Sequence, residues 1–110
     1  MKIDEASFGP DYPKVAIRLN NLAQLLKDTN RLDEAEPLMR RALKIDESSF
    51  GPDHPKVATR LNNLAQLFGA TNRLDEAEPL MRRALKIFED SLGRDHPKTQ
   101  TCRNNLKYLK

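Results

Sequence analysis

Few side chains in this sequence could do chemistry, and those few recur at the spacing of a repeat. His54 and His96 stand one repeat apart in the same Asp-His-Pro context, and the single cysteine is Cys102. A metal site needs ligands that converge, whereas a repeat keeps equivalent residues apart. We therefore predict that both histidines begin helices or form turns. A lone thiol with no histidine motif beside it indicates neither a nucleophile nor a metal cluster.

The densest acidic group, Asp33, Glu34 and Glu36, is typical of a helix start, where negative charge is favourable. Nothing around it indicates the apolar pocket that would raise a carboxylate pKa for acid–base catalysis. Glycine-rich phosphate loops, serine nucleophile elbows and His-Glu-x-x-His motifs do not occur in the sequence. We expect a protein that is not an enzyme and that has no cofactor and no metal.

The strongest pattern is a run of carboxamides. Leu-Asn-Asn-Leu-Ala-Gln-Leu spans residues 19–25 and returns at 61–67, and Arg-Asn-Asn-Leu at 103–106 is a degraded third copy at the same interval. Self-similarity at this period is the mark of a repeat array. Residues 1–42 and 43–84 differ at only seven positions, and residues 85–110 begin a third unit, so the chain holds two and a fraction units.

The elements that carry this pattern are predicted to be pairs of helices. Val15, Leu19, Leu22 and Leu26 fall at helical spacing between Lys14 and about Asp28, and Leu19, Leu22 and Leu26 are expected to lie in the core. Asn30 suits the left-handed position that ends a helix, and a second helix is expected from about Leu32 to Ser49. One such hairpin cannot bury its own apolar face, and stacked copies supply the core.

We therefore predict an all-α fold, a right-handed α-α superhelix of antiparallel hairpins. Four segments are expected: the tail of a preceding second helix and a turn at 1–12, a first full hairpin at 13–50, a second at 55–92, and the first helix of a truncated third at 97–110.

The net charge of +3 does not by itself indicate nucleic-acid binding. Both full units are neutral, and the excess lies in residues 85–110, with six basic against three acidic side chains. Phosphate recognition needs a basic face that continues along the binding surface, so no nucleic-acid partner is expected. No signal peptide or run of about 20 apolar residues is present, so we expect no membrane partner and a cytoplasmic location.

The sequence resembles the tetratricopeptide repeats, in the longer-period form of kinesin light chains and their bacterial relatives. The residues that carry the resemblance are Leu19-x2-Leu22-Ala23-x2-Leu26, followed by Ala35-x3-Met39-x2-Ala42. In that family the first helices line a concave groove, and an asparagine at the position of Asn21 and Asn63 holds a peptide backbone through its donor and acceptor groups. The resemblance thus implies a groove lined by Asn20, Asn21, Gln24, Lys27, Asn62, Asn63, Gln66, Asn104 and Asn105.

The function expected on these grounds is a protein-interaction scaffold that binds a peptide or helical segment in this groove. The amides could instead be only a solvated face, or could bridge neighbouring helices. A rival function is structural: a fragment of a long, near-identical array whose main activity is self-stacking or domain-swapped oligomerisation through its open ends. A third hypothesis is an oligomerising sensor arm of a signalling ATPase.

Overall fold

Five helices follow one another along residues 13–109, the part of the chain that the computed structural model describes. They are α2 (Pro13–Asp28), α3 (Leu32–Phe50), α4 (Pro55–Ala70), α5 (Leu74–Leu92) and α6 (Pro97–Tyr108). The predicted helix tail at Lys2–Phe8 and the predicted turn at Gly9 lie outside the described residues. No strand occurs among residues 13–109, and the predicted all-α solenoid is confirmed.

The sequence marks the start of the first helices α4 and α6 with histidine and proline. The Nδ1 atom of His54 accepts a hydrogen bond from the backbone N–H of Lys56 at 3.1 Å, and Nδ1 of His96 does the same for Lys98. The proline that follows each histidine needs no hydrogen-bond donor in the first turn. The histidines are N-caps, as predicted.

Asparagine ends the first helix of each hairpin. Asn30 and Asn72 both have φ 63°, the left-handed conformation that short amide side chains tolerate. The chain then turns back on itself, because the next backbone N–H bonds to a carbonyl inside the helix, from Arg31 to Leu26 at 2.7 Å and from Arg73 to Phe68 at 2.8 Å. Gly51 and Gly93, with φ of 91° and 92°, end the second helices.

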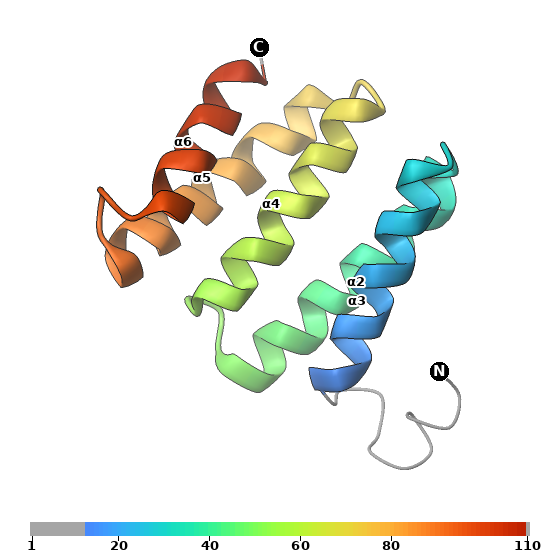
Figure 1. The fold of residues 1–110 in the computed structure, drawn as a ribbon, viewed down its shortest axis with the longest axis horizontal. Helices are drawn as coiled ribbons and strands as arrows, with labels where there is room; N and C mark the ends of the chain where they lie inside the picture. Colours follow the sequence, from blue (N-terminus) through green and yellow to red (C-terminus); the bar gives the residue numbers. More distant parts are fainter. Residues whose placement is uncertain (1–12, 110) are drawn as a thin grey trace.

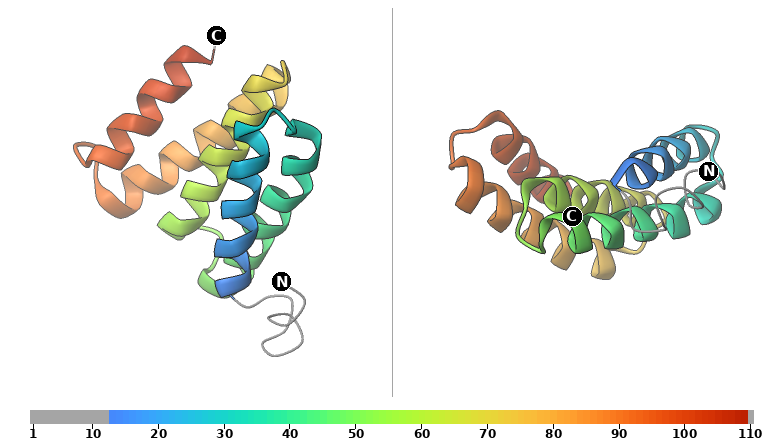
Figure 2. Two further views of the ribbon diagram at one scale, coloured as in Figure 1. Left: turned by 45° about the vertical axis from the view of Figure 1, so that its right-hand side comes forward. Right: turned by 90° about the horizontal axis from the view of Figure 1, so that it is seen from below.

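The hairpins are arranged as two curved layers. The first helices α2, α4 and α6 lie in front in Figure 1, and α3 and α5 lie behind them. Seen from below, the first helices line the inner side of the arc and the second helices its outer side (Figure 2). The sequence segments that carry the carboxamides therefore face the concave side.

Leucine, alanine, valine and methionine build the core, as the stripes predict. Fully buried side chains include Leu19, Ala23, Ala35, Met39, Ala42, Leu61, Leu64, Ala65, Ala77, Met81 and Ala84. One prediction is wrong: Leu22 is 41% exposed, although its equivalent Leu64 is 1% exposed. The helix α4 has a preceding hairpin to cover that side, and no described helix covers the same side of α2.

A contact between successive hairpins is called a seam here. The first seam joins α2–α3 to α4–α5, and the second joins α4–α5 to α6. In the first seam the Phe68 ring lies under two guanidinium groups, Arg40 at 5.0 Å and Arg73 at 4.3 Å from its centroid. Glu36 accepts hydrogen bonds from both arginines and ties the first hairpin to the second.

No helix in residues 13–109 is long and apolar enough to cross a lipid bilayer.

Candidate functional site

The predicted amides form one hydrogen-bonded bridge across each seam. Asn63 donates from Nδ2 to Oδ1 of Asn20 at 3.3 Å, and Asn105 donates from Nδ2 to Oδ1 of Asn62 at 3.4 Å. In both bridges the donor is the second asparagine of an Asn-Asn pair, and the acceptor is the first asparagine of the preceding pair. The structure thus contains the bridging that the sequence left open as an alternative role.

The bridges leave part of the hydrogen-bonding capacity of each amide side chain unused. A carboxamide has two N–H donors and an oxygen with two lone pairs, so each bridge uses one of two donor hydrogens and one of two acceptor sites. The bridged Asn20, Asn62, Asn63 and Asn105 are all partly accessible. The bridge fixes the orientation of these side chains, which lowers the entropic cost of a further hydrogen bond to a ligand.

The other predicted residues lie at the ends of the row or beside it. Asn21 and Asn104 are exposed, and the described residues give their side chains no hydrogen bond. Gln24, Lys27 and Gln66 are partly buried. Gln66 and Asn105 line a hollow of about 260 Å³ together with Gly69, Leu74, Met81, Tyr108 and Leu109. A side chain at Gly69 would crowd this hollow, because its Cβ would lie 3.3 Å from Cδ2 of Leu109.

A second hollow lies across the same seam, nearer the helix starts. Its volume is about 250 Å³ and it is lined by Thr59, Asn62, Phe88, Pro97, Lys98 and Thr101. The sequence analysis did not predict this hollow. Phe88 stands where the preceding copy has Asp46, and only the folded chain shows that this position faces α6.

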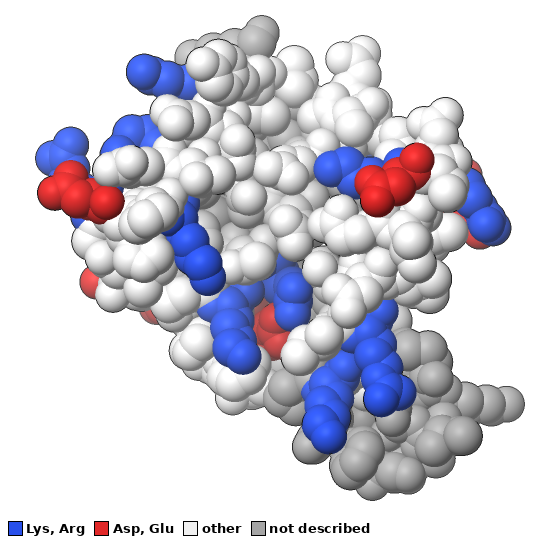
Figure 3. Space-filling model, in the orientation of Figure 1, with Lys and Arg blue, Asp and Glu red and all other residues white. Residues whose placement is uncertain are grey.

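Charge is divided between the two layers of helices. The three first helices carry eight lysine and arginine side chains and one acidic side chain, Asp28. The two second helices carry ten acidic and six basic side chains. The concave face in Figure 3 accordingly shows many Lys and Arg side chains and few Asp or Glu. Counting charge by repeat hid this division, because every full repeat contains one helix of each kind.

Cations cluster where two first helices begin. A shallow hollow of about 210 Å³ is lined by Lys56, Thr59, Arg60 and Lys98, three of which are basic. Lys14 occupies the equivalent position on α2, so one lysine per hairpin follows the row of helix starts. We call Lys14, Lys56 and Lys98 the lysine row. The face is therefore suited to negative charge.

The glutamates whose pKa is shifted are not suited to acid–base catalysis. The pKa of Glu34 and that of Glu76 are held below the usual range by hydrogen bonds from Arg31 and Arg73. Burial would raise the pKa of Glu36, but hydrogen bonds from Arg73 and Arg40 outweigh it and lower the pKa. These carboxylates are ionised at neutral pH and are poor general acids.

Cys102 is buried, and burial raises the pKa of its thiol to about 11. It is therefore protonated and unreactive at neutral pH. Residues 13–109 contain no group of three His, Cys, Asp or Glu side chains placed to hold a metal ion.

Comparison of the sequence with models of known protein families finds a match to one family. Residues 1–48 and 19–90 match the sequence model of the Tetratricopeptide repeat. No curated protein sequence matches the chain.

Solved structures share the fold over nearly the whole chain. The crystal structure of BtubC (BKLC) from P. vanneervenii superposes with a TM-score of 0.89 at 28% identity, covering 98% of this chain and 43% of that one. Two crystal structures of a Podosopora anserina kinesin light chain protein with nearly identical TPR-like repeats superpose at 0.82 and 0.80, each at 19% identity over 98% of this chain and 51% of that one. The chain thus spans about half or less of the proteins that it resembles.

Proposed function

Because the chain belongs to the tetratricopeptide repeat family, whose members are in general protein-interaction scaffolds, we propose that it binds an extended, acidic peptide segment along its concave face. The first helices supply both the cations and the amides for such a ligand. The peptide backbone would bond to the amide donors and acceptors that the bridges leave unused, and its carboxylates would lie against the lysine row.

The observation that carries this proposal is the division of charge between the layers. The first helices carry eight cations against one anion, and the second helices carry ten anions. Arg60 and Arg103 pair with Asp46 and Glu89 of the second helices, so we assign ligand binding to the lysines of the first helices. A face of one sign steers ligands of the opposite sign and speeds their association. An acidic ligand would be complementary in charge to this positive face.

The repeat spacing supports an extended ligand. Each seam has one amide bridge, and the two bridges follow one another across the first helices. A peptide that crosses the first helices would therefore meet one bridge per hairpin, and an extended backbone would present its N–H and C=O groups to these amides.

The test compares two pairs of lysines, one pair in each layer of helices. Lys56→Gln with Lys98→Gln removes two charges from the first helices, and Lys44→Gln with Lys86→Gln removes two charges, also one repeat apart, from the second helices. Affinity for fluorescently labelled acidic peptides is measured by anisotropy at several salt concentrations. We expect the first variant to lose about tenfold in affinity, since two charge contacts of this kind contribute about 0.5–1 kcal/mol each, and the second to bind like wild type.

Equal losses in both variants would show that only the net charge matters, and the groove assignment would be wrong. An Asn21→Ala, Asn63→Ala double substitution tests the amides separately, and unchanged affinity would remove them from the site. A single-stranded oligonucleotide of the same charge is the competing ligand. If it binds more tightly than the acidic peptides, the proposal of a peptide ligand fails.

A further inference from the structure

The hollow at the starts of α4 and α6 brings three cations around one space, and we call it the cation hollow. Its volume is about 210 Å³, and it is lined by Lys56, Thr59, Arg60 and Lys98. The two lysines are the second residues of α4 and α6, so the partly positive starts of two helices add to the charge. Lys and Arg side chains gather over this part of the concave face in Figure 3. The cation hollow is therefore suited to an anion.

A buried carboxylate holds Arg60 in place. The Nε atom of Arg60 donates to Oδ2 of Asp46 on α3 at 2.7 Å, and the two side chains are 13% and 2% exposed. The described residues give the terminal nitrogens of Arg60 no hydrogen bond. A guanidinium has five N–H donors in one plane, so the bond to Asp46 uses one donor and orients the other four. Asp46 is thus a positioning residue for an arginine with unused donors.

The net charge of the cation hollow comes from its two lysines. In the part of the chain that the structure describes, no carboxylate pairs with Lys56 or Lys98. The Nζ atom of Lys56 lies 4.9 Å from the centroid of the Phe50 ring, a contact that positions the ammonium group without neutralising it. Because Asp46 balances the charge of Arg60, two positive charges remain. The lysines thus supply the charge, and Arg60 supplies directed N–H donors.

A phosphate monoester matches the cation hollow better than a carboxylate does. It carries a charge of about −1.5 to −2 at neutral pH and has three strong acceptor oxygens, whereas a carboxylate has one charge and two oxygens. Arginine in addition binds phosphate through two parallel N–H···O bonds. A space of about 210 Å³ has room for a group of this size, since a water molecule takes about 30 Å³ in the liquid.

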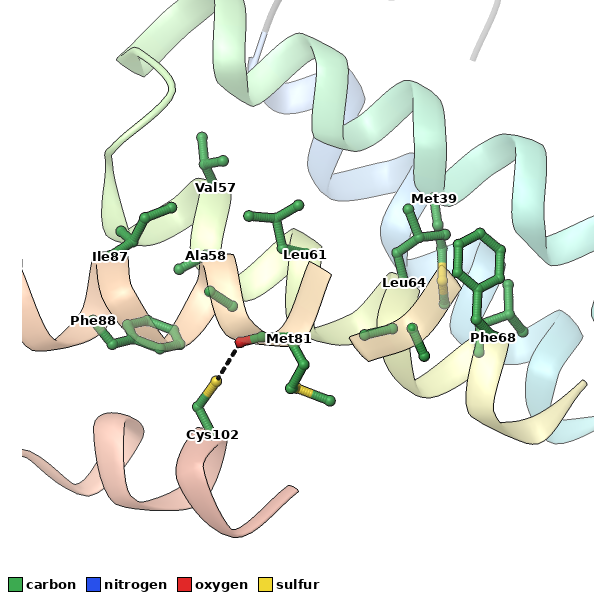
Figure 4. Close-up of a cluster of buried hydrophobic side chains, with 14 of the residues drawn as sticks. Met39, Val57, Ala58, Leu61, Leu64, Phe68, Met81, Ile87, Phe88 and Cys102 are labelled. Atoms are coloured by element: carbon green, nitrogen blue, oxygen red, sulfur yellow. Dashed lines mark hydrogen bonds between the residues drawn. The ribbon is translucent and has the colours of Figure 1, made fainter. Parts of the chain in front are cut away.

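The second seam has an uncharged pair where the first seam has Asp46 and Arg60. Phe88 and Cys102 stand at these two positions in the next repeat. Both are buried in one hydrophobic cluster, and the Cys102 thiol donates to the carbonyl oxygen of Met81 at 3.7 Å (Figure 4). The chain therefore contains its own example of how the two positions are filled without an arginine and without a carboxylate.

We propose that the cation hollow binds the phosphate group of a phosphorylated serine or threonine in the peptide on the concave face, with Arg60, Lys56 and Lys98 as its donors. This inference rests on the proposed function, because it gives the chemistry of one side chain of the ligand proposed there. A phosphorylated side chain gains contacts at this place that glutamate does not. The array thereby distinguishes a phosphorylated partner from its unmodified form.

The test uses two labelled acidic peptides that differ in one side chain. One carries phosphoserine and the other glutamate at the same central position, and both affinities are measured by anisotropy. We expect the phosphopeptide to bind about tenfold more tightly at about pH 7.5. Most of this preference should disappear at about pH 5, because the second pKa of phosphoserine is about 6.

The variants separate the arginine from the charge. Asp46→Phe with Arg60→Cys installs the pair of the second seam, leaves no carboxylate buried alone and keeps the net charge, so the preference should fall to about twofold. Lys98→Gln should lower the preference about twofold to fivefold. Lys107→Gln, which removes a charge from the same helix outside the cation hollow, is the control and should leave the preference unchanged.

Equal affinity of wild type for the two peptides would overturn the inference and leave the proposed function standing. A preference that survives Asp46→Phe, Arg60→Cys, or that falls as far in Lys107→Gln as in Lys98→Gln, would do the same. If the double variant does not fold, Arg60→Lys keeps the charge but loses the two parallel bonds. An unchanged preference in that variant would refute the role of Arg60.

If neither peptide binds, the proposed function fails and the cation hollow is tested alone. The probe is N-acetyl-phosphoserine amide, with N-acetyl-glutamate amide as its control, and the signal is the NMR resonance of the Arg60 Nε–H group. We expect the phosphate probe to shift this resonance and the control to leave it in place. A resonance that neither probe shifts, or that both shift equally, would overturn the inference.

Discussion

Thr99 is the buried polar side chain whose replacement should stabilise the protein. It is 0% exposed, and its Oγ1 atom has no hydrogen-bond partner among residues 13–109. The other first helices have valine at this position, and Val15 and Val57 are equally buried. We therefore expect Thr99→Val to raise the free energy of unfolding.

The size of the gain follows from the hydroxyl alone, because valine and threonine have the same shape and leave no cavity. A buried hydroxyl without a partner costs about 1–3 kcal/mol, so a gain of about 1–2 kcal/mol is expected. For a domain of this size that corresponds to a rise in Tm of about 4–8 °C.

The assay has to follow α6, since a terminal helix can open without the rest of the chain. Cys102 lies in the same helix and is the single cysteine of the chain. Its rate of modification by a thiol reagent therefore reports how often α6 undocks. Thr99→Val should slow this modification about 5- to 30-fold, the population change that corresponds to about 1–2 kcal/mol.

The reciprocal substitution is the control. Val57→Thr places the same hydroxyl in the equivalent buried site of α4, and should destabilise the protein by a similar amount. The reasoning is refuted if Thr99→Val leaves both the modification rate and Tm unchanged while Val57→Thr destabilises, because Thr99 would then have found a partner such as a water molecule.

Two further predictions concern the first seam and the thiol. Phe68→Leu, which restores the residue of the preceding copy at Leu26, removes both guanidinium–ring contacts and should cost about 1–2 kcal/mol in urea unfolding; an unchanged midpoint would show that the arginines gain nothing from the ring. Because burial raises the pKa of Cys102 from about 9 to about 11, the folded form is favoured below the unfolded pKa, and that stability is lost as pH rises through the folded pKa. Wild type should therefore lose about 2 kcal/mol relative to Cys102→Ala between about pH 9 and 11, and parallel stability curves for the two proteins would contradict this cause.

Much of the fold could be predicted because the residues that start and end the helices occur at equivalent positions in successive repeats. Asn30 and Asn72 turn the chain, and histidine followed by proline starts α4 and α6. Leu22 shows the limit of this reasoning, since burial depends on the neighbour that a hairpin has, and periodicity within one helix contains no information about the neighbour.

The candidate site was less accessible to sequence reasoning. The asparagines could be singled out by their recurrence, but their bridging across the seam is a contact between residues of different repeats. Phe88 and Cys102 are single departures from the repeat, and only the packing shows that both lie in one hydrophobic cluster.

The separation of charge between the layers has a consequence for how the molecule meets a partner. A positive inner layer and a negative outer layer give the array an electric dipole directed across its thickness. In the field of an anionic surface such a body rotates before contact, and within about 8 Å at physiological salt it turns its hollow side forward. The curvature and the charge of the array thus select the same direction of approach.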